Sequence, residues 1–124
     1  MELGNVYLKE EKFDTAKKYY EKALEITEET QKEENTPQIR RDIAVCYMKL
    51  GDVCQEEKKF DEARKYFEDS FVIKKSLYEE ERTKERYVDC VITCKRLINI
   101  CRFDGNIALM LKWFEVFQSL GKTE

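Results

Sequence analysis

Five cysteines are the side chains of this sequence whose type and spacing could do chemistry. Cys90, Cys94 and Cys101 are four and seven residues apart, which places them on one face of a helix. Thiolates arranged in this way could bind a metal ion or form a thiol switch. The sequence has no CxxC pair, however, and cysteine is among the residue types most often buried. We therefore expect all five, which include Cys46 and Cys54, to be core residues, with no metal and no cofactor.

Other catalytic arrangements find little support in the residue types present. Histidine is absent, which removes the usual general base and the commonest metal ligand. Without histidine, a serine or cysteine nucleophile of the Ser/His or Cys/His kind is excluded as well. No glycine-rich phosphate loop appears, and no pair of carboxylates stands out as a general acid and base. We expect a protein that is not an enzyme.

The composition indicates one folded, helical domain. Of the 124 residues, 42% are hydrophobic and 40% are charged, which is too apolar for disorder and suits long helices with charged surfaces. A net charge of −3 gives no electrostatic basis for binding nucleic acid or an anionic membrane. No apolar run approaches the roughly 20 residues of a membrane-spanning helix. An odd number of cysteines favours a reducing cytoplasm over a secreted disulfide framework.

A repeat of 47 residues organises the chain. The stretch LGNVYLKEEKFDTAKKYYEKALEI, residues 3–26, aligns with LGDVCQEEKKFDEARKYFEDSFVI, residues 50–73, and 12 of the 24 positions are identical. A third and weaker copy, LINICRFDGNIALMLKWFEVFQSL, occupies residues 97–120 and keeps Gly105 in its turn. An internal repeat of this size is typical of solenoid proteins, in which each unit packs only against its neighbours.

Apolar residues recur at intervals of three and four within each copy, which predicts helices. Thr36 followed by Pro37, and later Thr83, are the expected starts of two first helices. Asp14 and Asp61 are candidate N-caps of the second helices, and Gly121 is a candidate C-terminal cap. The prediction is six helices, at about 1–11, 14–33, 37–58, 61–81, 84–103 and 106–120.

Small and aromatic residues hold the same positions in the first two copies. They are Leu3, Gly4, Tyr7, Phe13, Ala16, Tyr20, Ala23 and Leu24 in the first, and Leu50, Gly51, Cys54, Phe60, Ala63, Phe67, Ser70 and Phe71 in the second. The glycines and the first alanines can let the two helices of a hairpin approach closely. This pattern resembles the tetratricopeptide repeat (TPR) family, and the 47-residue unit is similar to long-unit TPR arrays of bacteria.

The resemblance implies an all-α fold, a right-handed α-solenoid of three TPR-like helical hairpins forming a single domain over residues 1–124. The hairpins would span about 1–34, 35–81 and 82–121. A standard unit has about 34 residues, so this one is extended. The family's turn glycine is also replaced, by Glu11 in the first copy and by Lys58 in the second.

The resemblance further implies a scaffold that binds a peptide or partner protein in a groove lined by the first helix of each hairpin. The candidate groove residues are Asn5, Met48, Lys49, Asp52, Gln55, Lys95, Arg96, Asn99 and Arg102. The basic members could accept an acidic or C-terminal carboxylate, and the asparagines could bond peptide backbone. The alternative is an ordinary solvated helix face. Only Asn5 and Arg96 match the carboxylate clamp of some TPR domains, which does not support clamp function.

The last predicted helix is apolar on two faces, and such a helix is usually buried on both. We expect Ile107, Met110, Phe114 and Phe117 to face the hairpin. The remaining stripe would then meet a second molecule, a further repeat of a longer parent chain, or the long helices of the second or third repeat. The candidate residues of this surface are Leu109, Trp113, Val116 and Leu120.

The sequence therefore predicts a cytoplasmic protein–protein interaction module. Two alternatives stay open: a self-associating structural module, such as a homodimer, and the receptor part of an intracellular peptide-sensing regulator. Only Met1 and Glu2 precede Leu3, whereas the helix containing Leu50 begins well before that residue. The first predicted helix is therefore short, and the alternatives of a complete protein and a slice of a longer one both stay open.

Overall fold

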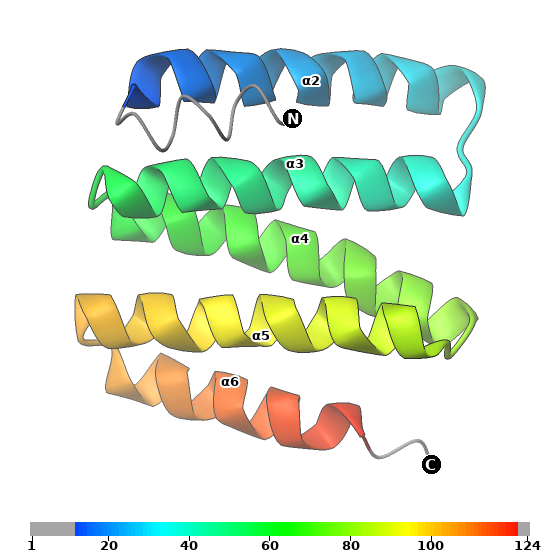
Figure 1. The fold of residues 1–124 in the computed structure, drawn as a ribbon. Helices are drawn as coiled ribbons and strands as arrows, with labels where there is room; N and C mark the ends of the chain where they lie inside the picture. The colour runs from blue at the N-terminus through cyan, green and yellow to red at the C-terminus, as the bar shows by residue number, and fades with distance from the viewer. Residues whose placement is uncertain (1–11, 122–124) are drawn as a thin grey trace.

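The computed structural model describes residues 12–121, and this part of the chain folds into α-helices joined by short turns. Each helix packs against the next along the chain, which gives the helical solenoid of Figure 1. The helices are α2 (Phe13–Glu33), α3 (Pro37–Glu56), α4 (Phe60–Glu80), α5 (Lys84–Asp104) and α6 (Ile107–Leu120). Their bounds lie within two residues of the predicted ones. The helix predicted over 1–11 lies outside the described residues.

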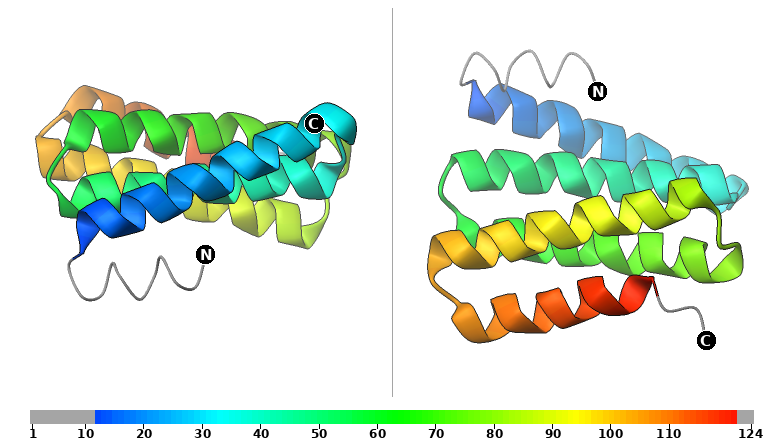
Figure 2. Two further views of the ribbon diagram at one scale, coloured as in Figure 1. Left: turned by 90° about the horizontal axis from the view of Figure 1, so that it is seen from above. Right: turned by 60° about the horizontal axis from the view of Figure 1, so that its bottom comes forward.

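The helices α3 and α5 run side by side in the same direction, and α4 packs against both of them in the opposite direction (Figures 1 and 2). The helices α2 and α6 lie at opposite ends of the stack. This arrangement brings the first helices of two successive repeat units next to each other. None of the helices in the described range is long and apolar enough to cross a membrane.

Threonine caps begin both first helices, as predicted. The Oγ1 atom of Thr36 accepts a hydrogen bond from the Ile39 backbone N–H at 3.2 Å, and Pro37 occupies the first turn. Thr83 accepts the equivalent bond from Arg86 at 3.2 Å. Each cap satisfies a backbone donor that an isolated helix end leaves without a partner.

The predicted aspartate caps are wrong. The N-cap positions of α2 and α4 are Lys12 and Lys59, and neither makes a side-chain capping bond. Asp14 and Asp61 lie in the first helical turn, where a carboxylate still interacts favourably with the positive end of the helix dipole. At α4 the helix starts earlier than an aspartate cap requires because a tight turn leads directly into it.

That turn holds a left-handed residue in two successive repeat units. Lys58 has a φ of 62°, and Gly105, at the same repeat position, has a φ of 77°. The backbone N–H of Lys58 bonds to Gln55 at 2.9 Å and that of Lys59 bonds to Cys54 at 2.8 Å, which closes the end of α3. The backbone therefore keeps the conformation that glycine adopts without strain, although a lysine occupies it.

The core forms where α4 meets its neighbours, and its closest approach is at Gly51. Phe67 and Ala63 are fully buried, and Phe67 packs directly on the backbone of Gly51. This confirms that small residues let the two helices of the hairpin come together. Phe60, the first residue of α4, links this helix to α5, because its ring stacks on Phe103 at a centroid distance of 6.2 Å.

The helix α6 packs against the core with residues of both predicted stripes. Trp113 packs edge-on against Phe71 at a centroid distance of 5.2 Å, and Leu120 is buried. Leu109 and Val116 also pack against the core, so the four residues expected on the free surface lie on the packed face. Of the stripe expected to face the hairpin, Met110 and Phe117 do pack against the core, whereas Ile107 and Phe114 are exposed, as is Leu111. Because both stripes are apolar, composition did not determine which residues of each would be buried; the packing of α6 against the rest of the core does.

Candidate functional site

Two ion pairs connect α3 and α5 across the face that these helices share. Arg41 binds Asp89 through two hydrogen bonds, from Nε at 2.8 Å and from Nη2 at 3.1 Å. Near the other end, the Nε atom of Arg96 lies 3.2 Å from the Oδ1 atom of Asp52. These contacts fix the spacing of the two helices at both ends of the face.

A hollow of about 250 Å³ surrounds the second ion pair, and we call it the Asp52 hollow. It is lined by Asp52, Gln55, Glu56, Arg96 and Asn99. Four of these are predicted groove residues, which the structure brings together from α3 and α5. Burial raises the pKa of Asp52, while Arg96 and Lys49 act to lower it. The hollow offers both donors and acceptors to a polar ligand.

The other predicted groove residues do not line this hollow. Met48 is only 7% exposed and belongs to the core, so its assignment to the groove is wrong. The reason is that α3 packs against both α2 and α4, which buries a wider arc of its surface than one stripe. Lys95 and Arg102 are exposed on α5, and Lys49 is half-buried. Asn5 lies outside the described residues.

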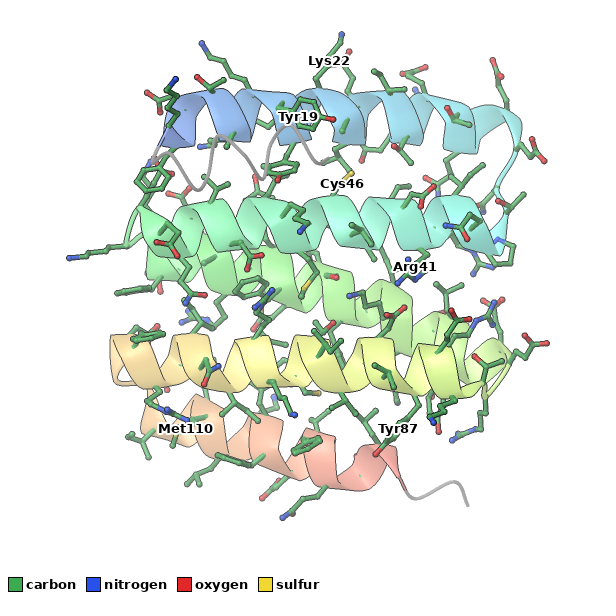
Figure 3. The ribbon with its side chains drawn as sticks, viewed as in Figure 1. Tyr19, Lys22, Arg41, Cys46, Tyr87 and Met110 are labelled. Atoms are coloured by element: carbon green, nitrogen blue, oxygen red, sulfur yellow. The ribbon has the colours of Figure 1, made fainter. Side chains whose placement is uncertain are left out.

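A larger hollow, of about 390 Å³, lies at the opposite end of the same face and was not predicted. We call it the Lys74 hollow. Its lining comes from the first turns of α3, from the first turns of α5, and from α4 beneath them. Figure 3 shows Arg41 extending from α3 into the space between these helices. The lining residues are Pro37, Gln38, Arg41, Lys74, Leu77, Glu85, Arg86 and Asp89.

Lys74 is the unusual member of this lining because only 5% of its surface is exposed. Its Nζ atom donates a hydrogen bond to the Oγ1 atom of Thr93 at 3.1 Å. Thr93 donates its own hydroxyl proton to the carbonyl of Asp89 at 2.8 Å, which turns an oxygen lone pair toward the ammonium. Burial lowers the pKa of Lys74. The sequence could have indicated this burial, because Lys74 lies four residues after Ser70 on the stripe of α4 that faces inward.

An apolar element of the same face was also missed. Val88 and Ile92 are 41% and 44% exposed on α5. Lys95 and Asn99 follow at intervals of three and four residues, so the four side chains share one side of the helix. The exposed side of α5 therefore passes from apolar to polar along its length, between the two hollows.

The cysteines lie in the core, as expected for small hydrophobic residues. All five are buried and unpaired. Burial raises the pKa of Cys94 to about 12 and that of Cys46 to about 11, so these thiols stay protonated at neutral pH. Within residues 12–121, no three His, Cys, Asp or Glu side chains are grouped closely enough to hold a metal ion.

The comparisons with known proteins agree with the internal repeat. Family models described as tetratricopeptide repeat match residues 1–28 and residues 44–75. These segments contain the two aligned stretches of the repeat, residues 3–26 and 50–73. Neither the curated proteins nor the solved structures gave a match.

Proposed function

Because the chain belongs to the tetratricopeptide repeat family, whose repeats generally mediate protein–protein interaction, we propose that it binds a segment of a partner protein along the shared face of α3 and α5. The proposed ligand is a peptide segment that runs over the Asp52 hollow, the exposed side of α5 and the Lys74 hollow. The proposal is of a binding module without enzymatic activity, acting in the cytoplasm.

The observation that carries this proposal is the continuity of the face. Two hollows lined by charged and amide side chains lie at its ends. Val88 and Ile92 lie between them and expose apolar surface. Peptide recognition needs this combination, because buried apolar contacts supply affinity while placed polar groups fix the register of the chain.

Selection from a randomised peptide library displayed on phage tests the proposal. Synthetic copies of the selected peptides are then titrated by calorimetry into wild-type protein and into Ile92→Glu. We expect Ile92→Glu to weaken binding at least about tenfold, because a charge replaces apolar contact area worth about 1.4 kcal/mol or more. The matched control is Val72→Glu, which changes a residue that is 67% exposed on α4 and should leave affinity unchanged.

Two results would contradict the proposal. One is a selection that yields no binding peptide. The other is a set of peptides that bind Ile92→Glu as tightly as they bind the wild type, because such peptides would dock elsewhere.

Self-association is a second candidate function, favoured by the exposed apolar stripe of α6. Ile107 and Leu111 are each 55% exposed and Phe114 is 38% exposed. At the matching repeat positions of α4, Phe60 and Arg64 contact Phe103 and Asp104 of α5. This face of a second helix is therefore one on which another helix packs, and two copies of the chain could cover both stripes with two-fold symmetry.

Sedimentation equilibrium tests this second candidate. A dimer should form at micromolar to millimolar protein concentration and dissociate in Leu111→Glu, while Val72→Glu stays dimeric. A wild-type monomer throughout this range would rule out self-association. The peptide-binding proposal does not depend on the result.

A further inference from the structure

The buried ammonium of Lys74 is the feature that the proposed groove leaves unexplained. Among the described residues it has one hydrogen bond, to Thr93, and no carboxylate in ion-pair contact. An ammonium has three N–H donors, so two of them remain. Burying a charge without a counter-charge is costly. An inward lysine at this position therefore has no evident structural benefit.

The internal repeat shows that the fold does not need a lysine here. The equivalent residue of α2 is Thr27, 47 positions earlier, which is half-buried. The Thr27 hydroxyl donates to the carbonyl of Ala23 within its own helix at 2.7 Å. The first repeat unit thus has a short side chain, Thr27, at this position. The second unit has a long cationic side chain, Lys74, beneath a hollow that is open to solvent.

The charges that line the hollow favour an anion. Arg41, Lys74 and Arg86 are the cations, and Glu85 and Asp89 are the carboxylates. Asp89 is paired with Arg41 through two hydrogen bonds, and its carboxylate acts on Lys74 without an ion-pair contact. Glu85 is exposed, so water screens its charge. The deepest charge of the hollow is therefore positive, and no carboxylate of residues 12–121 makes an ion-pair contact with it.

We propose that the Lys74 hollow receives a glutamate side chain of the partner segment, whose carboxylate pairs with the Lys74 ammonium. This inference rests on the proposed function and specifies the chemistry of its ligand. Lys74 belongs to α4, which lies beneath α3 and α5, so the carboxylate must reach past both helices. A long acidic side chain can do this while the backbone of the partner segment stays at the rim.

A double-mutant cycle tests the pairing directly. A selected peptide and its Glu→Gln copy are each titrated into wild-type protein and into Lys74→Met. In the wild type, the loss of the carboxylate should weaken binding about tenfold or more, as expected for a charge-assisted hydrogen bond. In Lys74→Met, the two peptides should bind equally, since the cation that distinguishes them is gone.

Matched variants keep the test interpretable. Lys74→Thr introduces the residue of the neighbouring repeat, and its far-ultraviolet circular dichroism should equal that of the wild type. Lys65→Met changes a lysine of the same helix whose side chain is 72% exposed, and it should preserve the full Glu-to-Gln difference. A third peptide with an amidated C-terminus separates a side-chain carboxylate from a terminal one.

The outcomes distinguish this inference from the proposed function. Peptides that bind the groove equally well with Glu or Gln would overturn the inference alone. A Glu-to-Gln difference that persists in Lys74→Met would overturn it too, as would a ligand that depends only on its terminal carboxylate. A selection that yields no peptide would overturn both proposals.

Discussion

The ring of Phe67 lies so close to the backbone of Gly51 that a β-carbon at residue 51 would come within 2.5 Å of Phe67 Cε1. Phe67 is fully buried, so the ring has no free space to enter. The contact joins the first and second helices of one hairpin, α3 and α4, both of which contribute residues to the proposed binding face.

Gly51→Ala should therefore lower the free energy of unfolding. Alanine gains about 1 kcal/mol over glycine in helix propensity, but overpacking a filled core costs about 1–3 kcal/mol, so a net loss of about 1 kcal/mol is expected. Urea unfolding followed by circular dichroism measures the change. Gly121→Ala is the control, because its nearest neighbour would be Tyr87 Oη at 3.7 Å, an ordinary contact. Equal stability of Gly51→Ala and wild type would show that the helices do not pack this closely.

Lys58→Gly should stabilise the protein. Lys58 holds a φ of 62°, which costs an L-residue roughly 1–2 kcal/mol and costs glycine almost nothing. After subtraction of the chain entropy that glycine adds to the unfolded state, a gain of about 0.5–1 kcal/mol is expected in urea unfolding. The converse substitution, Gly105→Ala, should destabilise by a similar amount although its side chain would meet open space. A loss of stability in Lys58→Gly would contradict the left-handed turn.

Trp113→Ala should destabilise far more than Leu111→Ala. Trp113 packs on Phe71 and its deletion leaves a cavity, for which about 2–4 kcal/mol is expected. Leu111 is 55% exposed, so its truncation should change stability by less than about 0.5 kcal/mol. Thermal or urea unfolding of the two variants separates the packed face of α6 from its exposed face. A larger loss of stability in Leu111→Ala than in Trp113→Ala would show that Trp113 does not lie on the packed face of α6.

The buried thiols should make the protein lose stability in alkali. Burial raises the pKa of Cys94 to about 12, and those of Cys46 and Cys90 to about 11, from an ordinary value of 9.0. Above pH 9.0 the unfolded chain loses thiol protons that the folded chain retains, so the unfolded state binds fewer protons and the free energy of unfolding falls as pH rises. Below that value the contribution is fully present.

Urea unfolding between pH 8 and pH 10 measures this dependence. Lys74, whose pKa burial lowers, acts in the opposite direction over the same range, so the wild type alone does not isolate the thiols. Cys94→Val removes one thiol and should lose stability less steeply with pH than the wild type. Parallel pH profiles for the two proteins would show that Cys94 does not contribute.

Local signals predicted the helices well because helix boundaries depend on neighbouring residues. Thr36 and Thr83 cap the first helices at the expected positions, and the small residues Gly51 and Ala63 lie in the expected close contact. The predicted cap at Asp61 was wrong because the left-handed turn at Lys58 leads into α4 with Lys59 as the N-cap, two residues earlier.

The proposed binding face was less predictable because it depends on how three helices meet. Four residues of the Asp52 hollow were among the predicted groove residues because helix periodicity places them on the same faces of α3 and α5. The Lys74 hollow was missed because its deepest residue belongs to α4, a second helix. Helix periodicity shows that Lys74 lies on an inward stripe, but it does not show that the lysine lines a hollow. Met48 was misplaced for a related reason, since periodicity does not show how wide an arc the neighbouring helices cover.

The most direct test of the central claim is an NMR map of where a selected peptide binds. Amide chemical shifts of labelled protein are followed while the unlabelled peptide is added. We predict that the largest shifts occur at Gln55, Val88, Ile92 and Asn99, on the shared face of α3 and α5. Largest shifts at Val72 of α4, or along Ile107 and Leu111 of α6, would contradict it, because the peptide would then bind outside the groove.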